Sequence, residues 1–523
     1  MKNLINKILV LGVILFMVSC SKDDYDKDKY ISKPQTYEDV SIGSKTGVKL
    51  DGLGVELDPH FFSQNLTRND GAKEADWEIV AQRVKAMQIH QLRVMLLPHW
   101  WEPVNDNDDP DYADLSHFTF DSEEMKSLYK VLDLAQENNI KVTLVVWGCP
   151  INMTLISGNH YGQKHFLCDS RPNPNWVCGT DKYKEFAENF SVVVKYLIDN
   201  KGYTCVKAIT PFNEPDTHVP EYGRTMWQGD PSWEDQYAPM VKALDAKFKE
   251  DGIRDKVQFN LSDNTDGSPD YLRSCTEELT NEADLFNSHT YRFGYNSTNS
   301  EIVDWESQNV AWANAAGKNH FVGEFGSNET FGASRQNDID SYERGVLMTR
   351  IVLNCLQAGA SGVSYWSLID QYYDRNDSYA QMQQLGLWKY TKEAYSSDAE
   401  AYSKIEEDYE VRPQYYAYSL LTRYIRPGSD IYPIDLGEEY AIGSAFEDED
   451  GKWTYVFANA SDIRKMLAIN NPETNGSFDI YVYAEKSLPE GDSLIEPSEI
   501  VETKDGRLEI MVRPNTIVLC HQK

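Results

Sequence analysis

Two short segments contain glutamates of the kind that could carry out catalysis. One reads Pro-Phe-Asn-Glu-Pro and holds Asn213 and Glu214, and the other reads Val-Gly-Glu-Phe-Gly and holds Glu324. Apolar residues precede both glutamates, which places each at the end of a predicted strand. Hydrolysis of a glycosidic bond needs two carboxyl groups facing one sugar carbon, one to protonate the departing oxygen and one to attack or to activate water. A single glutamate at a strand end is more often a solvated turn residue or a helix cap, so the pair must be judged by its setting.

Eight short apolar segments alternate with longer segments of helical periodicity from about residue 52. This alternation predicts repeated βα units and a parallel sheet. The eight predicted strands end at or near Leu57, Leu96, Gly148, Pro215, Asn264, Tyr291, Gly326 and Leu368. The predicted helices include 76–90, a segment that begins at Asp121 with a capping-box-like pattern, 182–199, 233–250 and 342–357. Eight such units predict an α/β fold, a (β/α)₈ TIM barrel over residues 52–426, whose active site lies at the carboxyl ends of the strands.

The residues after the barrel have a different pattern. Segment 412–425 is predicted to be the eighth helix, which Arg426, Pro427 and Gly428 end. Residues 427–523 then contain short strand-like segments separated by Gly, Asn and Asp, which predicts a β-sandwich. Residues 41–51 are predicted to add a strand to it. The sandwich either packs structurally or binds glycan, and the lack of an ordered set of exposed aromatic residues favours packing.

The first twenty residues have the features of an export signal. Lys2 and Lys7 precede an apolar segment, 8–18, which is too short for a permanent membrane span. The ending Met-Val-Ser-Cys resembles a bacterial lipobox with Cys20 as the lipidated residue, and an ordinary signal peptide with an incidental cysteine is the alternative. Residues 21–40 are charged and predict a flexible tether. Acidic residues directly after Cys20 resemble the surface-export signal of Bacteroidetes lipoproteins, so we expect an outer-membrane, surface-exposed protein that contacts the membrane only through its lipid.

Composition excludes several partners. The net charge is −33, with 83 acidic and 50 basic residues, so nucleic acid is not an expected partner. The eight cysteines include Cys20, and the remaining seven cannot all pair within one chain. Cys168 and Cys178 flank one loop and could form a disulfide in an oxidising compartment. No CxxC motif or histidine-rich cluster is present in the sequence, so neither a metal nor a cofactor is predicted. The oligomeric state is left open.

Further polar and aromatic side chains fall at the same ends of the predicted strands. They are Arg93 on the second strand, Trp147 on the third, His289 and Tyr291 on the sixth, and Trp366 on the eighth. His289 and Tyr291 are two residues apart and therefore share one face of their strand. Each residue alone is more simply explained as a buried side chain with a backbone partner. The ordered set is harder to explain in that way.

Taken in strand order, these residues resemble the retaining glycosidases of glycoside hydrolase clan A. In that clan an asparagine and the acid/base glutamate follow strand four, matched by Asn213 and Glu214, and the nucleophile lies on strand seven, matched by Glu324. Other positions of the clan are matched by Arg93, His289, Tyr291 and Trp366. The resemblance covers residues 50–426. The appended sandwich is similar to that of families 30 and 39, and the His-x-Tyr pair to family 5. Family 5 has a histidine where this chain has Trp147, so no family is assigned.

The resemblance implies a two-step reaction that retains configuration. With the carboxyl groups about 5 Å apart there is no room for water, so Glu324 attacks the sugar and Glu214 serves first as acid and then as base. The ionised Glu324 would raise the pKa of Glu214. Arg93 and Tyr291 would keep Glu324 ionised and oriented by donating hydrogen bonds. Asn213 would bind the 2-hydroxyl group of the sugar.

Aromatic residues near the strand ends are candidates for sugar contact. Trp366 either forms the floor beneath the reacting ring or belongs to the barrel core. His99, Trp100 and Trp101 follow the second strand and predict a binding loop. Trp147 either shares that role or fills the top of the barrel. The long segments 148–180 and 370–390 should shape further subsites.

The sequence therefore predicts a hydrolase of a β-linked polysaccharide or oligosaccharide, with internal cleavage favoured because a surface enzyme meets polymer first. Cleavage from a chain end is the alternative on the same fold. A non-catalytic surface protein that binds glycan is a second alternative. A barrel enzyme of another chemistry, such as a lyase or aldolase, is a third, but no strand end offers a convincing Schiff-base lysine or set of metal ligands.

Overall fold

The computed structural model describes residues 36–59, 74–102, 106–107, 109–146, 183–216, 233–328, 330–331, 335–336, 338–372, 382–389 and 408–523. The chain divides into two compact units, residues 1–38 and 39–523. Of the first unit only residues 36–38 are described, and the second unit contains the barrel and the C-terminal sheets. Cys20, Trp147, Cys168 and Cys178 lie outside the described residues, so the lipid anchor and the disulfide stay predictions.

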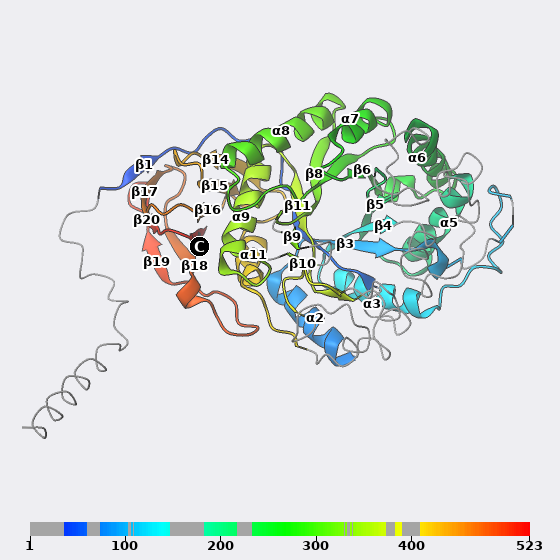
Figure 1. Cartoon of the computed structure of the whole chain (residues 1–523), viewed down its shortest axis with the longest axis horizontal. Coiled ribbons are helices and arrows are strands. Elements are labelled where there is room, and N and C mark those ends of the chain that lie inside the picture. The colour runs from blue at the N-terminus through cyan, green and yellow to red at the C-terminus, as the bar shows by residue number, and fades with distance from the viewer. Residues whose placement is uncertain are drawn as a thin grey trace, which may run out of the picture. The chain divides into compact units, whose positions relative to one another are not determined.

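Eight parallel strands close into a barrel in the order β11-β2-β3-β4-β5-β6-β7-β8 (Figure 1). Their bounds are β2 (Gly52–Glu56), β3 (Gln91–Leu96), β4 (Lys141–Val146), β5 (Val206–Thr210), β6 (Gln258–Asn264), β7 (Leu285–Thr290), β8 (Asn319–Phe325) and β11 (Gly362–Tyr365). Each overlaps one of the eight segments expected to be strands, and β3 and β8 begin one residue earlier than expected. The predicted (β/α)₈ barrel is confirmed.

A helix follows each barrel strand. The helices are α2 (Glu74–Met87), α3 (Glu123–Glu137), α5 (Tyr183–Lys195), α6 (Trp233–Glu250), α7 (Pro269–Glu278), α8 (Asn299–Ala315), α9 (Tyr342–Gln357) and α11 (Pro413–Tyr424). The expected cap at Asp121 is wrong, because Ser122 is the residue whose side chain accepts a hydrogen bond from the backbone N–H of Met125, at 3.1 Å. None of the described helices combines the length and the apolar character needed to cross a membrane.

Side chains alternate between the two faces of the barrel strands. On β3, Leu92, Val94 and Leu96 belong to the main core between strands and helices. Gln91 and Arg93, at the intervening positions, line a cavity of about 20 Å³ inside the barrel. Because successive side chains of a strand point to opposite faces, Arg93 points to the inner face of the barrel and not into the apolar core.

The C-terminal residues form the predicted β-sandwich. One sheet has the order β14-β15-β16-β21-β18-β19 and the other β1-β17-β20. The bounds are β14 (Asp430–Ile434), β15 (Ala441–Glu447), β16 (Trp453–Asn459), β21 (Thr516–Gln522), β18 (Ser477–Tyr483), β19 (Glu499–Glu502), β1 (Glu38–Val40), β17 (Lys465–Asn470) and β20 (Arg507–Val512). The N-terminal segment joins both sheets, through β1 and through an isolated bridge between Ile42 and Ile434. Its strand therefore begins at Glu38, within the stretch expected to be tether.

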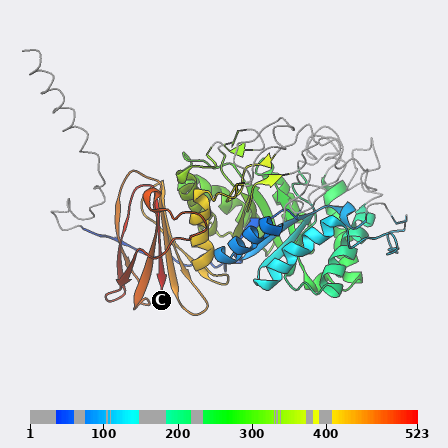
Figure 2. The same ribbon diagram turned by 90° about the horizontal axis from the view of Figure 1, so that it is seen from below.

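Helices α9 and α11 lie between the barrel and the sandwich (Figures 1 and 2). Almost every residue of α9 is buried, because the barrel covers one side of this helix and the sandwich the other. Tyr483 of β18 donates a hydrogen bond to the backbone oxygen of Tyr342, at 2.7 Å. A Cβ atom on Gly345 would come within 2.3 Å of the Tyr483 hydroxyl, so this close approach requires glycine. The sandwich thus supports the helices after strands seven and eight of the barrel.

Two short hairpins extend from the loops after β8 and β11. They are β9 (Thr330–Phe331) with β10 (Arg335–Gln336), and β12 (Gln371–Tyr372) with β13 (Met382–Gln383). Both belong to loops on the face formed by the carboxyl ends of the barrel strands. The second of these loops is one of the two segments expected from the sequence to shape subsites.

His90 connects three elements beneath the barrel and gives a stability prediction. Its Nδ1 accepts from the backbone N–H of Leu53, at 3.0 Å, and its Nε2 donates to the backbone oxygen of Thr422, at 2.8 Å. Burial lowers the pKa of His90 from 6.5 to about 4. The unfolded chain therefore binds a proton below pH 6.5 that the folded protein does not, and stability is lost as the pH falls towards 4.

Because of His90, we expect the unfolding free energy to decrease by about 3 kcal/mol when the pH is lowered from 7 to 4. Urea unfolding of the wild type and of His90→Gln at both pH values measures this contribution. The stability advantage of the wild type over the variant should shrink by that amount on acidification. An advantage that does not change with pH would contradict a neutral, buried His90.

Candidate active site

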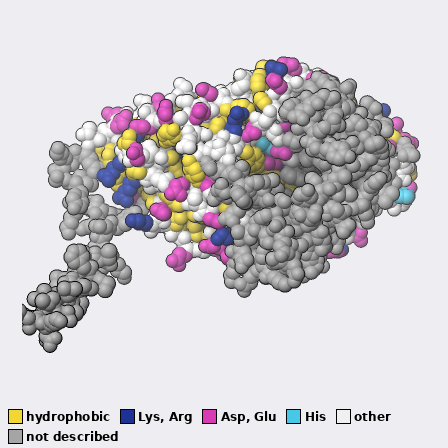
Figure 3. Space-filling model, in the orientation of Figure 1, with side chains coloured by type: hydrophobic (Ala, Val, Ile, Leu, Met, Phe, Trp, Pro, Cys, Tyr) yellow, Lys and Arg dark blue, Asp and Glu magenta, His cyan; other side chains and the backbone are white. Residues whose placement is uncertain are grey.

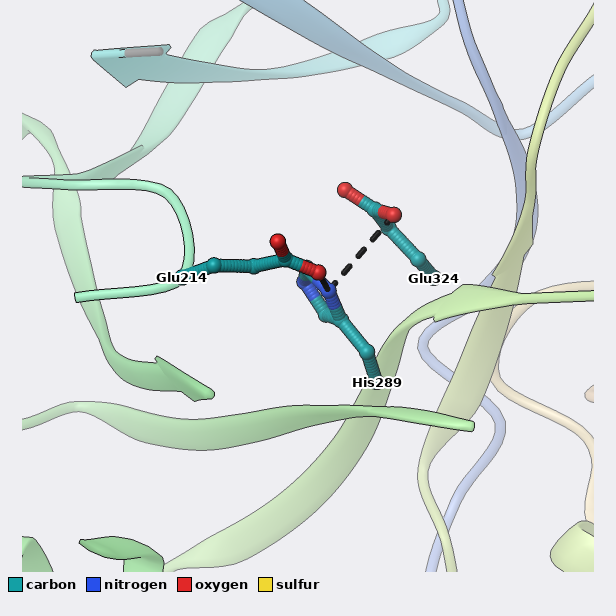
Figure 4. A group of neighbouring side chains, drawn as sticks. All are labelled: Glu214, His289 and Glu324. Atoms are coloured by element: carbon teal, nitrogen blue, oxygen red, sulfur yellow. Dashed lines mark hydrogen bonds and ion pairs between the residues drawn. The ribbon is translucent and has the colours of Figure 1, made fainter. Parts of the chain in front are cut away.

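The structure brings Glu214 and Glu324 together at the mouth of the barrel. Glu214 follows β5 and Glu324 lies near the end of β8. One carboxylate oxygen of each and a ring nitrogen of His289 lie within 4.8 Å of one another. Figure 4 shows the two carboxyl groups directed towards each other with the His289 ring beside them. The Glu214 side chain is 26% exposed and that of Glu324 only 5%, so one carboxyl reaches solvent and the other is enclosed.

Backbone hydrogen bonds hold the loop that carries Glu214. The N–H of Asn213 donates to the backbone oxygen of Val146 at the end of β4, at 2.8 Å, and the N–H of Glu214 donates to that of Asp263 on β6, at 3.0 Å. Glu214 and Asp263 have φ values of 44° and 54°, in the left-handed region that side chains disfavour. Such strain is maintained only where the surroundings enforce it, and it is common at functional sites.

Arg93 holds the buried carboxylates in place. Its Nη1 lies 2.7 Å from Glu324 Oε1 and 2.9 Å from Glu56 Oε2. Its Nη2 donates to Asp263 Oδ2 at 2.7 Å and to Asn213 Oδ1 at 2.6 Å. Burial alone would lower the pKa of Arg93, but the charges of Asp263, Glu324 and Glu56 outweigh it and raise that pKa well above its ordinary value. One guanidinium group therefore fixes four side chains around the mouth of the barrel.

Tyr291 fixes the other oxygen of Glu324. Its hydroxyl donates to Glu324 Oε2 at 2.7 Å, while its backbone N–H donates to Asp266 at 2.8 Å. Burial raises the pKa of Tyr291 well above its ordinary value, and the charge of Glu324 adds to this effect. The phenol therefore stays neutral and remains a donor. Both oxygens of Glu324 are oriented, as expected for Arg93 and Tyr291.

His289 lies between the two glutamates. Its Nδ1 is 2.9 Å from Glu214 Oε1 and 3.5 Å from Glu324 Oε2, and its Nε2 is 3.2 Å from Asp263 Oδ1. Burial lowers its pKa, but the charges of Glu324 and Asp263 and the hydrogen bonds to Asp263 and Glu214 raise it well above 6.5. These neighbours favour the imidazolium form of His289, in which both ring nitrogens carry a proton.

Burial and the neighbouring charges act in opposite directions on the pKa values of the carboxyl groups in this cluster. Burial raises the pKa of Asp263, but Arg93 and His289 reverse this and lower it. For Glu324, burial raises the pKa, His289 and Arg93 lower it, and Glu214 raises it further, so the net direction is upward. Arg93 thus favours the ionised form as expected, yet burial outweighs it. His289 and Arg93 thus favour an ionised Glu324, whereas burial and the neighbouring Glu214 favour its protonated form, so ionisation of both glutamates at once is disfavoured.

The remaining predicted residues have different positions. Trp366 packs with Met95 and Leu385 in a small apolar cluster that Tyr291 borders. Asn213 is buried, and its Nδ2 has no hydrogen-bond partner among the described residues.

The binding loop expected at Trp100 and Trp101 is wrong. Both rings are buried in the main core, because the chain turns inward after β3 and Trp101 Nε1 donates to the backbone oxygen of Asn189 on α5, at 3.0 Å. The side chain of His99 and the whole of Trp147 are outside the described part of the chain. Consecutive tryptophans here stabilise packing between a loop and a helix.

Two members of the cluster, Glu56 and Asp263, were not among the site residues predicted from the sequence. Glu56 is the last residue of β2 and Asp263 the next-to-last residue of β6, in the segments Gly-Leu-Gly-Val-Glu-Leu and Asn-Leu-Ser-Asp-Asn. A charged residue in the last inward position of a buried strand is the signal that could have identified them.

Glu56 gives a prediction for the pH dependence of stability. Burial raises its pKa well above 4.5, Arg93 opposes this and Glu324 adds to it. Above pH 4.5 Glu56 is ionised in the unfolded chain but neutral in the folded protein. The unfolding free energy therefore decreases as the pH rises above 4.5. Glu56→Gln removes this loss. Its unfolding free energy relative to wild type should rise between pH 4 and pH 8. Urea unfolding measures it, and a difference independent of pH would contradict a neutral Glu56.

No protein-family model and no curated protein matches the sequence. Solved structures do match. The catalytic domain of a family 30 xylanase C from Talaromyces cellulolyticus has a TM-score of 0.63 at 14% identity, over 93% of this chain and 100% of that one. A family 39 β-xylosidase from Caulobacter crescentus has a TM-score of 0.58 at 12% identity, with 93% and 100% covered. An endo-β-1,6-glucanase has a TM-score of 0.55 at 14% identity, with 94% and 95% covered.

These comparisons define the class of fold. Families 30 and 39 are two of the three that the sequence resembles, and the expected resemblance to clan A is confirmed for the fold, sandwich included. Identities of this size carry no information on the sugar.

Proposed function

We propose that this protein is a retaining β-glycoside hydrolase in which Glu324 is the nucleophile and Glu214 the acid/base. The observation that supports this most is the approach of the two carboxyl groups to within 4.8 Å at the carboxyl ends of β5 and β8. Retaining glycosidases hold their carboxyl groups about 5–5.5 Å apart, whereas inverting enzymes leave about 6.5–9.5 Å for a water. The contacts of Arg93 and Tyr291 with the two oxygens of Glu324 fit the same roles.

The reaction follows from these positions. An oxygen of Glu324 attacks the anomeric carbon while the bond to the leaving oxygen breaks and Glu214 transfers its proton to that oxygen. The new ester removes the negative charge of Glu324, so Glu214 can remain ionised. Water then gives a proton to Glu214, its oxygen bonds to the anomeric carbon, and Glu324 departs. Two inversions restore the original configuration.

We propose a β-linked polysaccharide or oligosaccharide as the substrate, with cleavage inside the chain favoured over cleavage from an end. The xylanase and endo-glucanase among the similar folds support this choice only by analogy. The segments expected to shape the subsites lie mostly outside the described residues. A non-catalytic, glycan-binding role remains the alternative from another class.

Release of reducing sugar from β-glucans, mannans, xylans and galactans tests the proposal. Activity on one of them should disappear in Glu214→Gln and in Glu324→Gln. The same variants should still bind that polymer in affinity electrophoresis, because neither substitution removes the sugar subsites. Wild-type binding without hydrolysis on the whole panel would favour the glycan-binding alternative, and activity that survives both substitutions would contradict the assigned roles.

We also propose that the protein is exported and anchored by a lipid on Cys20. A charged segment of tether composition and an acidic surface suit a protein held away from a membrane. Acidic side chains are spread over the described part of the face drawn in Figure 3. Cys20→Ser should move the protein from the membrane fraction to the soluble fraction of its host. Unchanged membrane association would contradict the anchor.

A further inference from the structure

A second group of carboxylates lies apart from the candidate active site, between the segment after β3 and the helix α5. It consists of Glu102, Asp106, Glu185 and Glu188. One oxygen each from Asp106, Glu185 and Glu188 lie within 4.8 Å of one another. Glu102 adjoins them, because its Oε1 accepts from the backbone N–H of Asp106, at 3.1 Å. Glu102 and Glu188 are each only 2% exposed.

Glu188 has an oxygen with no hydrogen-bond partner. Its Oε1 is buried and accepts from no group, although the side chain is almost entirely enclosed. The two oxygens of a carboxylate share one carbon, so Oε1 either faces Asp106 and Glu185 directly or lies beside the oxygen that does. A buried carboxylate oxygen without a donor is costly unless something absent from the protein chain satisfies it.

Two members of the group, Asp106 and Glu188, have no cationic partner among the described residues. Within the described residues, neither Asp106 nor Glu188 forms an ion pair with a lysine or arginine, and Lys247 acts on Glu188 only at a distance. Burial is the main cause that raises the pKa of Glu102 and of Glu188 to about 8, and the neighbouring carboxylates contribute to this rise.

We propose that Asp106, Glu185 and Glu188, with Glu102 beside them, bind one Ca²⁺ ion. Ca²⁺ takes oxygen ligands at about 2.3–2.6 Å, so two of its ligands lie at most about 4.6–5.2 Å apart. The 4.8 Å limit among the three carboxylates fits this range. The donors are all oxygens, which favours a hard cation over zinc or copper. The flexible coordination of Ca²⁺ suits this irregular set better than the strict octahedron of Mg²⁺.

The candidate active site meets the same distance limit but does not need a cation. Glu324 already contacts Arg93 and Tyr291, and Glu214 contacts His289. Its charges are balanced by side chains of the protein. Asp106 and Glu188, by contrast, form no ion pair with a lysine or arginine among the described residues.

The proposed ion would have a structural role. It would connect the loop after the second barrel strand to the helix after the third, where Asn189 Nδ2 already donates to Glu102 Oε2, at 2.8 Å. Both segments flank the face that carries Glu214 and Glu324. Binding should thus raise the melting temperature whether or not the protein is a hydrolase.

The test uses the whole mature protein, treated with EDTA and dialysed. Calorimetric titration with CaCl₂ should give one site, and saturating Ca²⁺ should raise the melting temperature by about 3 °C, with a smaller effect of MgCl₂. Glu188→Gln should weaken Ca²⁺ binding at least tenfold and abolish the rise. Glu123→Gln, on the exposed part of α3, is the matched control and should behave as the wild type.

Three outcomes would overturn the proposal. They are no heat of binding in the wild type, wild-type affinity in Glu188→Gln, and equal loss in Glu123→Gln. Without Ca²⁺, Glu188→Gln should melt no lower than the wild type, because it removes a buried repulsion. If circular dichroism shows that this variant does not fold, Asp106→Asn takes its place, and retention of wild-type Ca²⁺ affinity there would equally contradict the site.

Discussion

Glu324→Ala is expected to reduce turnover by about 10⁴-fold or more on every substrate that the wild type cleaves. The variant loses the atom that bonds to the anomeric carbon, and no other described carboxylate takes that position, because Arg93 and His289 hold Asp263 inside the barrel. Initial rates on the polymer found by the panel, and on an activated aryl glycoside of the same sugar, measure the loss. A decrease of less than about 100-fold on both would contradict Glu324 as nucleophile.

Azide gives this variant a second readout. The space left by the Glu324 carboxylate lies on the side of the sugar opposite the leaving group, so azide should attack there and form a glycosyl azide of inverted configuration. Azide would not restore cleavage in a preparation of Glu324→Ala that had failed to fold. Formation of an azide product with retained configuration would mean that another residue acts as nucleophile.

Glu214→Ala is expected to discriminate between substrates. Without the acid, cleavage of the polymer should fall by about 10²–10⁴-fold, because its leaving sugar needs a proton. An aryl glycoside whose leaving group is stable as an anion needs little protonation, so its first step should persist. The covalent intermediate should then accumulate as a burst of released phenol, since the base that activates water is missing as well.

A matched pair of substrates makes this measurement decisive. The ratio of kcat/KM for the aryl glycoside to that for the polymer should rise at least tenfold in Glu214→Ala and stay constant in Glu324→Ala. Equal losses on both substrates in Glu214→Ala would contradict the division of roles. Azide should rescue this variant too, but with retained configuration, because it attacks from the side where Glu214 stood.

The sequence predicted the barrel well because its signals are local and repeated. Each strand is a short apolar segment, each helix has its own period, and the predicted bounds of α6 and α9 agree with those observed. The ends of apolar strands also indicated Glu214 and Glu324, because a parallel barrel brings the carboxyl ends of all its strands to one face. The structure places Arg93 and Tyr291 in contact with Glu324, and the catalytic roles expected for them stay predictions.

Other features depend on contacts between distant segments. The burial of Trp100 and Trp101 is decided by α5, which lies more than eighty residues further along the chain. Asp263 reaches Arg93 and His289 through a left-handed turn at the end of β6 that no local pattern announces. The net rise in the pKa of Glu324 depends on how fully the barrel buries it, which residue types alone do not reveal.

The covalent intermediate itself tests the roles of the two glutamates most directly. A 2-deoxy-2-fluoro glycoside with a good leaving group, made from the sugar that the panel identifies, slows the second step more than the first. Mass spectrometry of the inactivated protein and of its peptides should find one sugar per chain, attached to Glu324. A label on any other residue, or rapid release of a product with inverted configuration and no label, would contradict a retaining pair formed by Glu214 and Glu324.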